Sequence, residues 1–239
     1  MTTARPDGRL ADALRPLSFE RGATPHAEGS CLARLGGTVV LCTATVEAAV
    51  PAWRKGTGMG WVTAEYAMLP RATVERTPRE RSGAGGRTHE IQRLIGRSVR
   101  AALRGFDFGE HTIRVDCDVL QADGGTRTTA ICGATVALAD ACDWLARSAG
   151  VMNPFARLVA AVSVGLAAGE ARLDLCYAED RDADVDANVV VAEPDRLVEV
   201  QATAERGTYS REDMDRLLDM ALLGTSRILA AQRAALQRA

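Results

Sequence analysis

The sequence predicts an α+β fold, in which strands pair through hairpins into mixed sheets that pack against helices. Two observations indicate this class. Segments that alternate apolar and polar residues lie in pairs around short turns rich in glycine or proline, and the helical segments between these pairs come singly. No low-complexity linker or short-period repeat interrupts the 239 residues, so we expect a single domain over 1–239.

The predicted strands share a period of two and lie next to turn signals. The alternation is clearest at 111–120, where every second residue from Ile113 to Val119 is apolar. Gly36 and Gly37 separate two strand-like runs and predict a hairpin. The strands are expected at residues 30–35, 38–46, 60–68, 111–120, 158–166, 171–177, 188–192 and 197–203.

Helical spacing of apolar residues predicts three helices. In the first, Arg93, Arg97, Arg100 and Arg104 fall on the stripe opposite the apolar face. The second is rich in alanine and almost wholly apolar, so it must be buried. The helices are expected at residues 88–103, at about 128–149 and from about 210 onward.

The overall charge gives no sign of a nucleic-acid or membrane partner, since 29 basic residues face 31 acidic ones and the net charge is −2. The distribution is uneven, however, because nine arginines but three acidic residues lie between Arg71 and Arg104. The first ten residues contain no apolar signal segment, and no run approaches the roughly 18 apolar residues that span a bilayer. We therefore expect a cytoplasmic protein without a membrane partner.

The six cysteines occur singly among apolar neighbours and lack Cys-x-x-Cys spacing. We expect them to be reduced core residues and not disulfides or metal ligands. The histidines at 26, 89 and 111 accompany no nucleophile-elbow motif, so a hydrolase triad has no support.

The segment 120–127 (LQADGGTR) joins an alternating strand directly to the first turn of the buried helix. Gly124 and Gly125 allow a ligand to approach the backbone closely, and the first N–H groups of the helix lie at the positive end of its dipole. Thr126 adds a hydroxyl group and Arg127 a planar fork of donors. The pattern is typical of a phosphate site, and the alternative is a plain Gly-Gly turn.

Two other regions carry charge that could serve a polyanionic substrate. The arginines between Arg71 and Arg104 could form a basic surface for a phosphate backbone, with a solvated helix face as the alternative. Residues 179–186 (EDRDADVD) are expected to form an acidic loop after an apolar strand. Closely spaced carboxylates can hold Mg²⁺ or donate a proton, and the alternative is a loop that is merely solvated.

Seven segments together resemble bacterial ribonuclease PH, and the likeness runs in order from about Arg5 to the final helix. The run 116–127 is the most specific of them. The segments are residues 26–30 (HAEGS), 60–66 (GWVTAEY), 68–71 (MLPR), 85–88 (GGRT), 90–94 (EIQRL), 116–127 (DCDVLQADGGTR) and 188–190 (NVV).

The resemblance implies a phosphate-dependent 3′-to-5′ exoribonuclease, a tRNA nucleotidyltransferase that shortens tRNA precursors and passes each terminal nucleotide to phosphate as a nucleoside diphosphate. It implies that the co-substrate phosphate is bound by Arg87, Gly125, Thr126 and Arg127. It also implies that Asp180 and Asp186 lie at the reaction centre. Between them, these two residues would bind a divalent cation such as Mg²⁺ and act as a general acid. We expect Asp186 to supply the proton that the departing 3′ oxygen receives.

The resemblance further implies a fold like that of the second domain of ribosomal protein S5, and a homohexameric ring built as a trimer of dimers. Such a ring would bring arginine loops of neighbouring subunits around a tRNA stem. Processing of rRNA and use of other RNA 3′ ends would also fit. The candidate RNA-binding residues are Arg71, Arg76, Arg79, Arg81, Arg93 and Arg97.

Three other functions fit parts of the sequence. An inactive RNA-binding scaffold subunit of an exosome-like ring would be expected to lack the pocket residues, which are present here. A subunit similar to polynucleotide phosphorylase would need a much longer chain. A nucleoside phosphorylase would share the chemistry but would not need the basic surface.

Overall fold

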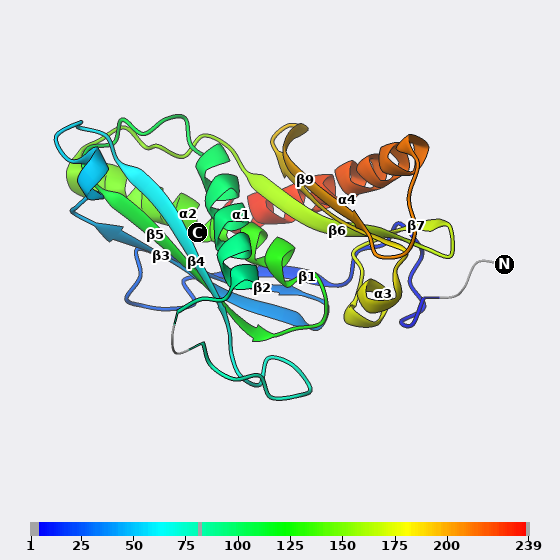
Figure 1. Cartoon of the computed structure of the whole chain (residues 1–239). Coiled ribbons are helices and arrows are strands. Elements are labelled where there is room, and N and C mark those ends of the chain that lie inside the picture. The colour runs from blue at the N-terminus through cyan, green and yellow to red at the C-terminus, as the bar shows by residue number, and fades with distance from the viewer. Residues whose placement is uncertain (1–4, 81–82, 238–239) are drawn as a thin grey trace.

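Two sheets and four α-helices make up the described part of the chain, residues 5–80 and 83–237, in the computed structural model (Figure 1). The first sheet has the order β1-β2-β3-β5-β4, and its β4–β5 pair is parallel while the other pairs are antiparallel. Its strands are β1 (Leu17–Arg21), β2 (Gly29–Leu35), β3 (Thr38–Glu47), β4 (Trp61–Met68) and β5 (Thr112–Gln121).

The second sheet is antiparallel and has the order β7-β6-β8-β9. Its strands are β6 (Val159–Ala167), β7 (Glu170–Leu173), β8 (Val185–Ala192) and β9 (Arg196–Ala204). The helices are α1 (Gly86–Ala101), α2 (Thr126–Ala149), α3 (Tyr177–Asp182) and α4 (Arg211–Gln237). Helix α1 packs on β4 and forms the crossover to β5, which is why these two strands run parallel.

Helix α2 is the central element, because it contacts β2, β3 and β5 of the first sheet as well as β6 of the second. Helix α4 packs on the second sheet through β6 and β7. Among the described residues, α2 is the one helix long and apolar enough to cross a membrane, but 78% of its apolar window is buried inside the protein. Its composition is therefore that of a core helix, as the sequence predicts.

Most elements appear where the apolar patterns place them. The hairpin around Gly36 and Gly37 is confirmed by β2 and β3, which pair from Gly29↔Ala44 to Leu35↔Thr38. The six cysteines are confirmed as free and buried. Strand β1 was not predicted, since its side chains alternate only between half-buried and exposed positions and include two charges.

Two predictions about residues 171–186 were wrong. The predicted strand 171–177 ends at Leu173, because Asp174 adopts a left-handed φ of 55° that a strand cannot contain. The expected acidic loop is instead helix α3 followed by the start of β8. The amide of Cys176 donates to Oε2 of Glu179 at 3.2 Å and completes a capping box, so the acidic residues begin a helix.

Gly133 allows α2 to lie close to the first sheet. A Cβ atom there would come within 2.8 Å of both Cβ of Ala33 and Sγ of Cys42, two groups fixed in the core. We predict that Gly133→Ala lowers the free energy of unfolding by about 1–3 kcal/mol, because strain outweighs the gain in helix propensity. Urea unfolding measures the difference.

The matched control is Gly96→Ala in α1, where the atom nearest to the added Cβ would be Nη1 of Arg100 at 3.1 Å, the end of a long side chain and not a group fixed in the core. It should leave stability unchanged or raise it by up to about 1 kcal/mol. Equal effects of the two substitutions would show that the contact between α2 and the first sheet is not tight.

Candidate active site

The loop between β5 and α2 has the geometry of an anion site. Gly124 and Gly125 both have positive φ, 72° and 65°, which residues with a Cβ atom rarely adopt. Gly125 is the N-cap of α2, and no described side chain caps this helix. The N–H groups of the first turn are therefore available to a ligand, with the positive end of the helix dipole behind them.

A tyrosine from the first sheet orients the hydroxyl group of Thr126. Tyr66 is buried on β4, and its hydroxyl donates a hydrogen bond of 3.0 Å to Oγ1 of Thr126. Burial raises the pKa of the Tyr66 phenol, so it keeps the proton that it donates. Because Thr126 accepts this bond, its own hydroxyl hydrogen can be donated to an oxyanion.

One cavity of about 200 Å³ lies between this loop, the start of α1, helix α3 and strand β8. The six residues predicted for phosphate binding and catalysis all line this cavity. They are Arg87, Gly125, Thr126, Arg127, Asp180 and Asp186.

Two arginines bring positive charge to the cavity. The side chain of Arg127 is 17% exposed, and its Nη1 lies 3.6 Å from Oε1 of Glu90 and 3.4 Å from Oε1 of Gln201. Arg87 is exposed on the first turn of α1. Both guanidinium groups act on Asp180, where they oppose the rise in its pKa. An anion bound between loop and helix would thus meet two cations.

The two aspartates come from neighbouring elements, Asp180 from α3 and Asp186 from β8. Burial raises the pKa of both carboxyl groups. For Asp186 the charge of Asp180 adds to burial, and the pKa rises to about 6. Asp186 is therefore the member of the pair that holds a proton more readily near neutral pH.

Two models of the 3′ exoribonuclease family match the chain, domain 1 over residues 13–142 and domain 2 over residues 157–224. The ribonuclease PH of Mycobacterium sp. strain KMS is 54% identical over 236 residues, which cover 97% of this chain and 91% of that protein. The chain belongs to the ribonuclease PH family. The ribonuclease PH of Mycobacterium avium strain 104 is likewise 54% identical, over 98% of this chain and 92% of its own.

Solved structures confirm the fold expected of a ribonuclease PH family member. Rice (Oryza sativa) Rrp46 superimposes with a TM-score of 0.79 at 23% identity, covering 98% of this chain and 100% of that one. The structure of the Archaeoglobus fulgidus exosome with RNA bound to its active site gives a TM-score of 0.78 at 19% identity, over 94% and 91%. At such identities the likeness concerns the fold.

The aspartate pair fits a divalent cation only in combination with a ligand. The described residues contain no cluster of three or more His, Cys, Asp or Glu side chains that could hold a metal alone. However, Oδ1 of Asp186 is buried and has no hydrogen-bond partner among the described groups. Mg²⁺ is commonly held by one or two carboxylates together with substrate phosphates, which matches an unpaired carboxylate oxygen beside a loop with the geometry of an anion site.

The arginines of α1 do not form the continuous free stripe that helical spacing predicts. Arg97 makes a bidentate ion pair with Glu199, at 2.6 and 2.5 Å. Arg100 lies 4.9 Å from the ring centre of Trp61. Arg93 lines a shallow hollow beside Arg97. The RNA contacts of Arg93 and Arg97 stay predictions, and Arg97 would have to leave Glu199 to make one.

The arginines of the loop before α1 are placed differently. Arg71, Arg76 and Arg79 are exposed between β4 and α1. None of the three forms an ion pair with a residue in the described part of the chain. Arg81 lies outside the described residues. This loop leads directly to Arg87, so a phosphate backbone that entered the cavity could pass over it.

Sequence reasoning gave no role in the site to three polar residues, although Tyr66 and Asn188 lie in segments that resemble the family. Ser163 and Asn188 are buried at the cavity wall, and Oγ of Ser163 accepts a 3.1 Å hydrogen bond from the amide of Leu175. Tyr66 acts through Thr126. The alternation of β4 places Tyr66 toward the core, but no pattern in the sequence shows that its hydroxyl meets Thr126.

We predict that Tyr66→Phe raises the KM for phosphate about fivefold, while the KM for RNA changes little. A fivefold change corresponds to about 1 kcal/mol, the contribution of one neutral hydrogen bond. Without Tyr66 the Thr126 hydroxyl can rotate away from the anion. Initial rates of phosphorolysis at varied phosphate measure the effect. Tyr209→Phe, in the segment before α4, is the control, and equal KM values for both variants would contradict the proposed orientation of Thr126.

Asp186 should make stability depend on pH in a definite direction. Its pKa in the folded protein, about 6, lies above the ordinary value of 3.8, so between these values the native state binds more protons than the unfolded chain. The contribution of Asp186 to the free energy of unfolding is therefore fully present below about pH 4, and it is lost as the pH rises through about 6.

Asp186→Asn should abolish phosphorolysis and yet stabilise the metal-free protein at pH 8 by on the order of 1–3 kcal/mol, because it removes the cost of a buried charge. The difference from wild type should vanish near pH 4. Urea unfolding at pH 4, 6 and 8 measures it, with Asp182→Asn on the exposed side of α3 as control. A wild type that is as stable as the variant at pH 8 would disprove the raised pKa.

Proposed function

We propose that this chain is a phosphate-dependent 3′-to-5′ exoribonuclease that trims the 3′ end of tRNA precursors and releases nucleoside diphosphates. One observation supports the proposal above all others. The glycine loop at the start of α2, the two arginines and the two aspartates line one cavity, although they come from four separate elements of the chain. Such a cavity suits two anionic groups that must be brought together.

In the proposed reaction, inorganic phosphate is the nucleophile. Arg87, Thr126, Arg127 and the backbone N–H groups that follow Gly125 hold it. An oxygen of the bound phosphate forms a bond to the phosphorus of the terminal linkage, and the bond from this phosphorus to the 3′ oxygen of the preceding nucleotide breaks. Asp186 gives its proton to the departing 3′ oxygen.

Asp180 and Asp186 would hold the divalent cation, Mg²⁺, whose chemistry is to neutralise charge between the two phosphates. A cation at Asp186 would lower the pKa of that carboxyl group, so proton donation by Asp186 requires Asp180 to carry the larger share of the cation. Asp180, held near Arg127 and Arg87, supplies the second carboxylate oxygen.

We further propose that the tRNA body lies on the loop between β4 and α1 and on α1 itself, with Arg71, Arg76, Arg79, Arg81, Arg93 and Arg97 as its contacts. Binding of this kind recognises the phosphate backbone and is largely independent of sequence. Because one cavity draws on both matched halves of the chain, residues 1–239 act as a single catalytic unit. A cytoplasmic homohexamer, a trimer of dimers, fits the family, and rRNA and other RNA 3′ ends are further substrates to test.

The decisive experiment uses a tRNA with a short 3′ trailer, incubated with the protein and Mg²⁺ in the presence or absence of phosphate. We predict release of nucleoside diphosphates that depends on phosphate. Release of monophosphates would indicate a hydrolase. Binding of the tRNA without any release would favour the alternative of an inactive scaffold subunit.

Arg127→Ala should reduce the rate in this assay at least about a hundredfold, because it removes a cation that offsets the repulsion between two phosphates. The matched control is Arg211→Ala at the start of α4, where the side chain is 95% exposed and remote from the cavity lining. Turnover of Arg127→Ala at the rate of the control would refute the placement of phosphate.

A further inference from the structure

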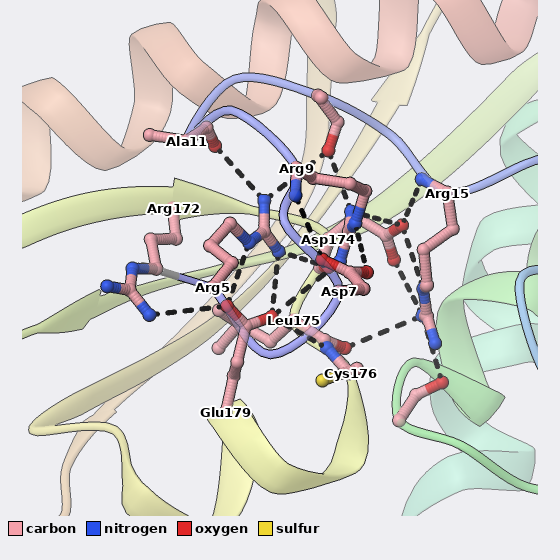
Figure 2. A network of polar contacts seen from close by, with 12 residues as sticks. Arg5, Asp7, Arg9, Ala11, Arg15, Arg172, Asp174, Leu175, Cys176 and Glu179 are labelled. Atoms are coloured by element: carbon pink, nitrogen blue, oxygen red, sulfur yellow. Dashed lines mark hydrogen bonds and ion pairs between the residues drawn. The ribbon is translucent and has the colours of Figure 1, made fainter. Parts of the chain in front are cut away.

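A buried cluster of charges joins the N-terminal segment of the chain to the turn that follows β7 (Figure 2). Arg5 and Arg15 come from the N-terminal segment, and Asp174 and Glu179 from the turn and from α3. All four side chains are almost completely buried, Asp174 at 0% and Arg15 at 4% exposure. Burying so many charges costs free energy, so the cluster is not explained as a simple source of stability.

Arg15 is the member of the cluster that reaches the proposed phosphate loop, residues 122–125 between β5 and α2. Its Nε and Nη2 donate to the two carboxylate oxygens of Asp174 at 3.0 and 2.7 Å. Its Nη1 donates to the carbonyl oxygen of Asp123, and Nη2 lies 3.3 Å from that of Gly124. Arg15 therefore binds the loop that begins α2 and the turn that begins α3 with one guanidinium group.

The two segments that Arg15 binds also touch each other. A Cβ atom at Gly124 would lie 2.6 Å from the carbonyl oxygen of Leu175 and 2.8 Å from the amide nitrogen of Tyr177. The amide of Tyr177 donates to Oδ1 of Asp123 at 3.3 Å. The phosphate loop therefore lies directly against the first residues of α3, and Asp180 follows within the same helix.

Arg5 fixes the other end of this short helix. It donates from Nε and Nη2 to both carboxylate oxygens of Glu179, each at 2.8 Å. Burial would raise the pKa of Glu179, but the hydrogen bonds from Arg5 and from the Cys176 amide outweigh it and the pKa is lowered. Glu179 is the immediate neighbour of Asp180, so Arg5 holds α3 at the residue before that carboxyl group.

We propose that Arg15, through its ion pair with Asp174, is a positioning residue for phosphorolysis: it fixes the phosphate loop relative to the helix that carries Asp180. The inference rests on the function proposed above. Arg15 does not line the cavity, so it acts through the groups that do. The nucleophile and the acidic pair approach the RNA from opposite segments, and a shift of about 1 Å between such segments can cost a hundredfold in rate.

The test is Arg15→Lys, compared with Arg21→Lys. Lysine keeps the positive charge beside Asp174, but a single ammonium group cannot span the carboxylate and both loop carbonyls. Arg21 makes a similar bidentate pair with Asp140 of α2, at 3.0 and 2.6 Å. It also donates to the carbonyl groups of Ala235 and Leu236 near the end of α4.

We expect Arg15→Lys to raise the KM for phosphate and lower kcat, each about tenfold, while the KM for tRNA stays within about twofold. Binding of inorganic phosphate, measured by calorimetry, should weaken to the same extent. Arg21→Lys should lose less thermal stability, because its ion pair is more exposed, and keep the wild-type phosphate KM, phosphate affinity and kcat. Assays are run well below the unfolding temperature of each protein, so that the folded fraction is equal.

Asp174→Asn is the second variant, used if Arg15→Lys does not fold. Asparagine tolerates the left-handed φ of 55° at this position and keeps one acceptor oxygen. It should change phosphate KM and kcat in the same direction by about threefold to tenfold.

Wild-type phosphate KM, phosphate affinity and kcat in a folded Arg15→Lys or Asp174→Asn would overturn the inference, as would equal losses of kcat in Arg15→Lys and Arg21→Lys. A wild-type protein that releases no nucleoside diphosphate would overturn the proposed function instead, and the calorimetric comparison would still decide whether Arg15 positions the phosphate loop.

Discussion

A Cβ atom on Gly124 would lie within 2.6 to 2.8 Å of the backbone of Leu175, Cys176 and Tyr177, so only glycine allows these two segments to meet. The phosphate loop belongs to the half of the chain that contains the first sheet, and the acidic helix α3 belongs to the other half. The candidate site exists where the two halves touch. Its geometry therefore depends on one backbone contact more than on any single side chain.

Charge then determines what the contact can do. On the side of the loop, the dipole of α2 and Arg127 favour an anion, whereas Asp180 and Asp186 lie across the cavity as a partly buried pair. The raised pKa of Asp186 shows that this pair is costly to keep fully charged. A cation or a proton relieves that cost, and both are what the departure of an RNA 3′ oxygen requires.

The sequence predicts the parts of this structure that depend on local patterns. Alternation places the strand before Gly124, and helical spacing places α1 and α2, because burial on one face imposes a period. The order of residues also predicts the anion loop. It could not predict that β4 lies parallel to β5, or that Tyr66 reaches Thr126, because these contacts join segments distant in sequence. Helix α3 was missed because its acidic residues are typical of a loop, and the Glu179 cap that makes them helical also depends on the distant Arg5.

The charge distribution also explains why phosphate, and not water, would be the nucleophile. Water is neutral and small, and it is activated by a base or a metal ion that acts on it directly. The loop side of the cavity offers donors instead: backbone N–H groups, the Thr126 hydroxyl hydrogen left free by Tyr66, and two guanidinium groups. These groups would stabilise an anion strongly and would do little for a neutral molecule. An anion that they hold against α3 already lies beside the acidic pair, so binding the nucleophile and orienting it are one event.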